Sequence, residues 1–141
     1  MGEREIASEA PPPSSAGQSP VQVLSRPDFE QAVRQALKNL HRPRELATNP
    51  LLRSRLVLER NGGDDPVESL RQLVLDAANS LNGSPKDEKL YRAITRTYLK
   101  PALSQEQAAE LLGLPFNTYR YHLSGGIRRI TDELWRIELE G

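Results

Sequence analysis

The stretch Ser104–Leu123 has the sequence SQEQAAELLGLPFNTYRYHL. Its pattern predicts two short helices joined by a tight turn. Ser104 can cap the first helix, and Gln107, three residues later, can reach back to it as in a capping box. Gly113 stands where that helix must stop, because the left-handed backbone conformation costs glycine little. Pro115 can start the second helix, since its φ angle is already fixed near the helical value.

The apolar residues of this stretch follow helical spacing. Those expected to pack inward or to anchor the turn are Ala108, Leu111, Leu112, Leu114, Tyr119 and Leu123. Ala109 is small at the point where a second helix must cross closely. The spacing is that of a helix-turn-helix: a small residue is followed four positions later by a glycine. Apolar residues then stand one, six and ten positions after that glycine. The second helix of that motif enters the major groove of DNA.

The stretch resembles the DNA-binding motif of sigma-factor region four and of LuxR-type regulators. The matching positions are Ala109, Gly113, Leu114, Thr118, Tyr119 and Leu123. The chain departs from that pattern at Pro115, where Ser or a similar cap is usual, and at Tyr119, where Val or Ile is commoner. The resemblance covers residues 86–130 and implies a trihelical DNA-binding subdomain. No aromatic-rich segment that could melt a promoter accompanies it, so we do not expect a complete sigma factor.

The composition is that of a globular chain. It has 141 residues, of which 37% are hydrophobic and 27% are charged, and its net charge is zero. No apolar run approaches the roughly 18 residues that a membrane-spanning helix needs, and the N-terminus has no basic-then-apolar signal peptide. Cysteine is absent, which excludes disulfides and thiolate zinc sites. We expect a cytoplasmic protein with no membrane partner.

The zero net charge conceals an uneven distribution of charge. Between Lys86 and Thr131 there are eight Lys or Arg residues against four Asp or Glu residues. The last ten residues are acidic. Positive charge is therefore concentrated on the part of the chain that resembles a DNA-binding motif, as phosphate binding requires.

The N-terminal part predicts a leader followed by helices. Residues 1–26 are rich in Pro and Ser with little apolar content, which indicates a disordered leader. Start signals for helices then occur at Asp28, at Asn49-Pro50, at Asp65-Pro66 and at Ser84-Pro85. We expect the second of these helices to run through Leu58 and the fourth to contain Leu90, Ile94 and Tyr98.

The resulting fold class is all-α: a multi-helix bundle with a C-terminal helix-turn-helix subdomain and a long last helix. All apolar runs have the 3.6-residue period, and none shows sustained alternation. We divide the chain into the leader, a helical scaffold or interaction subdomain over 27–83, and a DNA-binding subdomain over 84–141. Because the loops are short, we expect the two subdomains to share one hydrophobic core.

The last helix is predicted to run unbroken from Phe116 to Glu138. Its apolar side chains keep to one face: Tyr119, Leu123, Ile127, Ile130, Leu134 and Ile137. Two adjacent glycines, at 125 and 126, oppose this prediction, because together they cost roughly 2 kcal/mol relative to alanine in a helix. The part beyond Ile130, with Trp135, could pack on the N-terminal helices, which we favour, or could form a homodimer seam.

Ten residues are candidates for contact with double-stranded DNA: Ser104, Gln105, Phe116, Asn117, Thr118, Arg120, Tyr121, Ser124, Arg128 and Arg129. Across a major groove Arg pairs with guanine and Asn with adenine. We therefore expect Asn117, Arg120 and Tyr121 to face the bases. The alternative is that these are the solvated surface residues of an ordinary packed helix.

The remaining candidates would contact the DNA backbone. Ser104 and Gln105 begin the first helix, whose unbonded N–H groups can bind a phosphate; the alternative for Ser104 is a plain cap. Arg128 and Arg129 could bind flanking phosphates or could instead pair with the nearby acids Asp132 and Glu133.

Other chemistry finds little support in the sequence. His41 stands alone, the loop Gly62–Asp65 lacks the ligand pattern of a calcium site, and no phosphate loop or nucleophile elbow occurs. We expect no metal, no cofactor and no enzymatic activity. The sequence favours a bacterial-type DNA-binding transcription regulator or accessory protein. The alternative is a helical protein–protein interaction module of a larger regulatory or polymerase-associated assembly, using the N-terminal helices or the helix 127–138.

Overall fold

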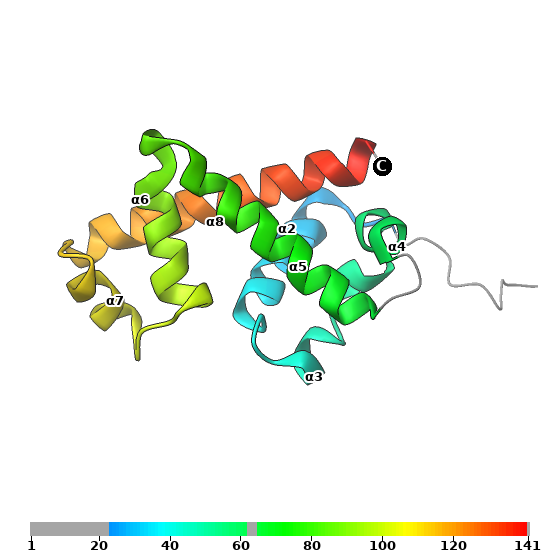
Figure 1. The fold of residues 1–141 in the computed structure, drawn as a ribbon, viewed down its shortest axis with the longest axis horizontal. Helices are drawn as coiled ribbons and strands as arrows, with labels where there is room; N and C mark the ends of the chain where they lie inside the picture. The colour runs from blue at the N-terminus through cyan, green and yellow to red at the C-terminus, as the bar shows by residue number, and fades with distance from the viewer. Residues whose placement is uncertain (1–22, 62–64, 141) are drawn as a thin grey trace, which may run out of the picture.

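The computed structural model describes residues 23–61 and 65–140, and every regular element in these two ranges is helical (Figure 1). The α-helices are α2 (Arg26–Lys38), α3 (Pro43–Leu46), α4 (Arg55–Asn61), α5 (Pro66–Asn79), α6 (Pro85–Ile94), α7 (Gln105–Leu111) and α8 (Phe116–Glu140). Two 3₁₀ turns, η1 (Pro50–Arg53) and η2 (Ser80–Gly83), and a π-helical turn, η3 (Thr95–Leu99), lie between them. The all-α prediction is confirmed.

Helix α8 is the axis of the molecule. It runs along the long dimension in Figure 1, with α6 and α7 at its first half and the N-terminal helices at its second half. It contacts α6 and α7 as well as α2, α4 and α5. The buried apolar side chains of both halves belong to one cluster, as expected for a shared core.

The glycine pair does not interrupt α8, so the prediction of one long helix is confirmed. Gly125 and Gly126 lie where α6 crosses, and Gly126 is packed against Ile94 and the backbone of Leu90. The missing side chains thus allow two helices to approach closely, and the packing of this crossing offsets the low helix propensity of glycine.

The end of α8 packs on the N-terminal helices, as we favoured. The rings of Trp135 and Phe29 meet edge to face, with 4.9 Å between centroids. The Arg26 guanidinium lies over the Trp135 ring at 5.5 Å from its centroid. Ile130 and Leu134 are fully buried within this chain. Those two side chains are therefore not available for a homodimer seam.

Glu138 is a buried carboxylate that caps another helix. Its oxygens accept hydrogen bonds from the backbone N–H groups of Arg55 at 3.3 Å and Leu56 at 2.9 Å, in the first turn of α4. The first N–H groups of a helix have no partner within it. An acid at the C-terminal end of the chain therefore completes a helix that begins at residue 55.

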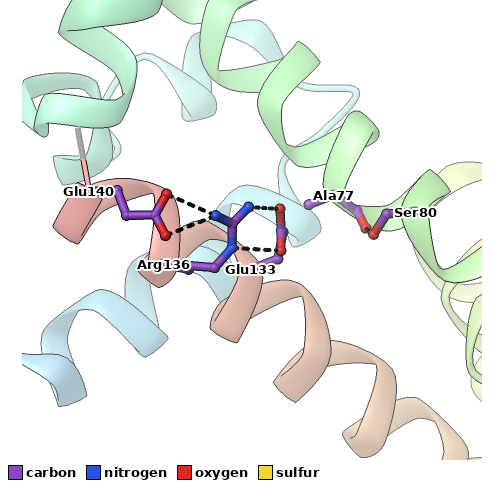
Figure 2. A network of polar contacts seen from close by, with 5 residues as sticks. All are labelled: Ala77, Ser80, Glu133, Arg136 and Glu140. Carbon is purple, nitrogen blue, oxygen red and sulfur yellow. Dashed lines mark hydrogen bonds and ion pairs between the residues drawn. The ribbon is translucent and has the colours of Figure 1, made fainter.

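Figure 2 shows an ion-pair network around Arg136 on the exposed side of the same helix, together with the separate Ser80–Ala77 hydrogen bond at the end of α5. Arg136 donates to the carboxylates of Glu133, one turn before it, and Glu140, one turn after it. The two carboxylates raise the pKa of the Arg136 guanidinium. Solvent-exposed pairs of this kind contribute little to stability.

Two boundaries near the N-terminus differ from the predictions. Helix α2 begins at Arg26 rather than Asp28, because Ser25 is its cap and accepts a hydrogen bond from the Asp28 backbone N–H at 3.3 Å. The predicted leader, 1–26, is therefore too long by at least two residues. Residues 1–22 lie outside the described range, as do residues 62–64 of the predicted turn.

The predicted helix from residue 50 to Leu58 is wrong, because the chain bends at Ser54. Asn49 caps the segment as expected, with 2.8 Å from its Oδ1 to the Leu51 backbone N. Its amide also donates to the Ala32 carbonyl of α2 at 2.9 Å, which holds the segment down on that helix. Ser54 is extended (φ −78°, ψ 161°), so a 3₁₀ turn precedes a separate α4.

The predicted helix from Ser84-Pro85 is α-helical only as far as Ile94. It continues as η3, where the Lys100 N–H donates to the Thr95 carbonyl five residues back at 2.7 Å. π-helical turns are rare, so helical periodicity alone gave no reason to expect one here. Tyr98 therefore lies in a widened turn rather than in the expected α-helix.

Candidate nucleic-acid interface

Helix α7 begins at the expected cap. Ser104 Oγ accepts from the Gln107 backbone N–H at 3.0 Å. The expected return bond to Ser104 is not formed; the Gln107 side chain accepts from the Leu103 N–H instead, at 2.8 Å. Both bonds satisfy N–H groups before the first full turn, so the start of α7 is fixed.

The turn after α7 has the expected left-handed glycine. Gly113 has a φ of 69°. Its N–H donates to the Glu110 carbonyl and that of Leu114 to the Ala109 carbonyl, both at 3.0 Å. This pair of bonds is the Schellman arrangement that closes helices at a glycine. Helix α8 then starts at Phe116, one residue after Pro115.

One inward position of α7 was predicted wrongly. Ala108 and Ala109 are buried and Leu112 is half-buried, but Leu111 is 56% exposed. In a helix of two turns, the buried alanines fix which face meets α8, and Leu111 points away from that face.

Tyr119 fixes the start of α8 against η3. Its side chain is fully buried, and its hydroxyl lies 2.5 Å from Thr97 Oγ1. The Thr97 hydroxyl donates to the Ala93 carbonyl at 2.7 Å. Since a threonine has a single hydroxyl proton, Tyr119 must be the donor to Thr97. The bulky residue at this position, where Val or Ile is commoner in the resembling families, thus has a specific partner.

Four of the predicted contact residues share the outer side of α8. Asn117, Tyr121, Ser124 and Arg128 follow one another at intervals of four, three and four, and all are exposed. We call these four the outer stripe. Such spacing places side chains on one face of a helix. In the described part of the chain, none of the four has a side-chain hydrogen bond or ion pair.

Arg120 lies beside the outer stripe rather than on it. It precedes Tyr121 by one residue but Ser124 by four, so its side chain lies at the edge of the stripe. Its Nη1 donates to Gln105 Oε1 at 2.6 Å, which joins the first turn of α8 to the first turn of α7. The structure therefore brings these two predicted residues together, and the Arg120 side chain is hydrogen-bonded within the chain.

Two further candidates flank the stripe. Phe116 is 39% exposed at the first position of α8, with its ring centroid 6.0 Å from that of Tyr119. Thr118 is half-buried.

Arg129 has a structural partner that the sequence did not suggest. Its Nη1 lies 2.7 Å from Asp87 Oδ1, and Asp87 is nearly buried in the first turn of α6. The alternative partners considered from sequence, Asp132 and Glu133, pair instead with Arg26 and Arg136. Arg129 thus joins α8 to α6, whereas its neighbour Arg128 has no ion pair with any described residue.

A basic hollow next to the start of α7 was not foreseen. It has a volume of about 420 Å³ and lies between α2, η3 and α7. Arg34 and Lys38 of α2 and Arg96 of η3 line it, together with Ser104 and Gln105. The sequence signal was weak, because only the tertiary fold brings α2 beside η3.

Tyr98 also lines this hollow. Burial raises the pKa of its hydroxyl, while the guanidiniums of Arg34 and Arg120 act in the opposite direction. Three cations and no Asp or Glu line the hollow, so its lining is positively charged.

Neither histidine is arranged as a metal ligand. The His41 Nε2 lies 3.0 Å from the carbonyl oxygens of both Tyr98 and Leu99, so it carries the proton and donates to them. The His122 Nδ1 is buried without a hydrogen-bond partner among the described residues. Burial, together with the nearby Lys89 charge, lowers the pKa of His122. Residues 23–61 and 65–140 contain no group of three His, Asp or Glu residues that could hold a metal ion.

The chain matches no protein-family model, no curated protein and no solved structure. Function is therefore inferred from the chemistry of the α7–α8 surface. Within the two described ranges no helix has the length and apolar character needed to cross a membrane.

Proposed function

We propose that the protein binds double-stranded DNA by placing the first half of α8 in the major groove, as a transcription regulator or an accessory protein of transcription. It has no catalytic role in this proposal. The observation that carries it is the outer stripe: an amide, a phenol, a hydroxyl and a guanidinium on one exposed helical face, none engaged within the described chain. These groups match the donors and acceptors on base edges and phosphates.

The neighbouring helix supports the same proposal. α7 is fixed by its cap and its glycine turn, and the Gln105–Arg120 bond holds its first turn against that of α8. A preorganised pair of helices loses little conformational freedom on binding. The resemblance to sigma region four and LuxR-type motifs gives these helices the supporting and recognition roles.

The first test is binding of a fluorescently labelled random-sequence duplex, followed by selection of the best-bound sequences. Asn117→Ala should weaken binding to the selected site by about tenfold to a hundredfold without changing the salt dependence, because a base contact is lost. Asn82→Ala, an exposed asparagine in η2, is the matched control and should bind as wild type. No binding of the wild type at low salt would contradict the proposal.

A protein-interaction role is the second candidate, and exposed leucines favour it. Leu103 and Leu111, before and at the end of α7, are 92% and 56% exposed. Leu111 borders a hollow of about 430 Å³ that also contains the cations Arg92, Arg96 and Lys100. An acidic partner with an apolar side chain would fit this hollow. Leu111→Ser should leave duplex binding unchanged, whereas loss of duplex binding in this variant would show that the hollow belongs to the DNA surface.

A further inference from the structure

The basic hollow beside α7 has walls that come from distant parts of the sequence. Arg34 and Lys38 are four residues apart, so they share one face of α2, and Arg96 faces them from η3. Ser104 and Gln105 close the hollow at the start of α7. We call this basic hollow, lined by Arg34, Lys38 and Arg96, the cationic groove.

The cationic groove contains no opposing charge. No Asp or Glu is among its lining residues, and none of its three cations forms an ion pair with any residue in 23–61 or 65–140. Like charges gathered in one hollow repel each other, and a bound anion removes that repulsion. The amides and hydroxyls that line the rest of the groove supply neutral hydrogen-bond donors. A phosphate group fits this combination, because it accepts from both kinds of donor.

The cationic groove shares one lining residue with a hollow beside the outer stripe. Arg34 also lines a second hollow, of about 220 Å³, together with Ser124 and Arg128 of the stripe and one acid, Glu30. Arg34 therefore stands between the face that we expect to meet bases and the cationic groove. In helix-turn-helix complexes the residues beside the recognition helix contact the flanking phosphates.

We propose that the cationic groove binds backbone phosphates of the DNA strand beside the major groove occupied by α8. Helix α2, from the N-terminal half, is then part of the DNA interface. This inference rests on the proposed function. The same phosphate chemistry is offered by small phosphate-bearing ligands, and the experiment separates the two sources.

The experiment compares the double variant Lys38→Gln/Arg96→Gln with wild type in duplex titrations between about 50 and 200 mM salt. Each lost phosphate contact should lower the slope of log K against log salt by about one. We expect a slope smaller by about two and an affinity lower by roughly tenfold or more near 0.1 M salt. Arg53→Gln/Lys86→Gln removes the same charge from η1 and α6 and should change neither quantity by as much. All four side chains are exposed, so both variants should fold, and circular dichroism checks this.

The outcomes distinguish this inference from the proposed function. Unchanged slope and affinity in the groove variant, while Asn117→Ala binds more weakly, would overturn the groove inference and leave the proposed function standing. Absence of duplex binding by the wild type would overturn both. A parallel titration uses inorganic pyrophosphate, followed by the amide NMR signals of α2 and α7. Pyrophosphate binding that the groove variant loses, together with unchanged duplex binding, would assign the groove to a small ligand and overturn the DNA assignment.

Discussion

The backbone of Gly126 in α8 packs directly against the side chain of Ile94 in α6: a Cβ atom at residue 126 would lie 2.7 Å from Ile94 Cγ1. Ile94 is fully buried and cannot move aside. Gly126→Ala should therefore destabilise the fold by roughly 1 kcal/mol. An overpacking cost of about 1–3 kcal/mol exceeds the gain of about 1 kcal/mol from better helix propensity. Urea denaturation followed by circular dichroism measures this change.

Gly125→Ala is the matched control for that prediction. The nearest atom to a Cβ at residue 125 is Leu90 Cδ2, at 3.2 Å, the end of a half-buried side chain that can shift. This variant should be neutral or more stable by up to about 1 kcal/mol. Equal losses of unfolding free energy in the two variants would show that the close approach of α6 at Gly126 is not what makes that substitution destabilising.

The carboxylate of Glu138 should contribute to stability through α4. Glu138→Ala leaves the first N–H groups of α4 without an acceptor, at a cost of about 1–2 kcal/mol, as for other lost helix caps. Glu140→Ala removes an exposed acid from the same helix and should stay within about 0.5 kcal/mol of wild type. Thermal denaturation of both variants makes the comparison, and a Glu138→Ala melting temperature equal to that of wild type would contradict the capping role.

Because its pKa is lowered in the folded protein, His122 makes the free energy of unfolding decrease as the pH falls. Its folded pKa lies below the ordinary value of 6.5, so the unfolded chain binds the proton more readily. The stabilising effect is fully present above pH 6.5 and decreases as the pH falls from there through the folded pKa. Between about pH 7 and pH 5, wild type should lose more unfolding free energy than His122→Gln, which has no titrating ring. Parallel curves for the two proteins would contradict this assignment.

Much of the fold could be predicted because its local signals are strong. The caps at Asn49, Asp65 and Ser104 and the glycine at 113 act within a few residues, and each behaves as expected. The break at Ser54 could not be predicted this way. The separate α4 that follows it has its first N–H group bonded to Glu138, 83 residues later in the chain, which no local pattern indicates.

In the candidate interface, too, the features that depend on a single helix could be predicted and those that depend on a neighbouring helix could not. The outer stripe follows from helical periodicity alone, once Tyr119 and Leu123 are known to face inward. The partner of Arg129 and the cationic groove could not be found, because both require α6 or α2 to be placed against the C-terminal helices. Helix periodicity shows which face of a helix is outward but not which helix lies next to it.

Docking of the outer stripe on DNA can be tested at Arg128 and Arg129, which are adjacent and chemically identical but have different partners in the fold. The measurement is the salt dependence of duplex binding by wild type, Arg128→Ala and Arg129→Ala, with the unfolding free energy of each. Arg128→Ala should lower the salt slope by about one and leave stability unchanged, because it loses a phosphate contact. Arg129→Ala should keep the slope and lose stability, because it leaves Asp87 without its partner. An unchanged slope in Arg128→Ala, or no duplex binding by the wild type at low salt, would contradict docking of the outer stripe on DNA.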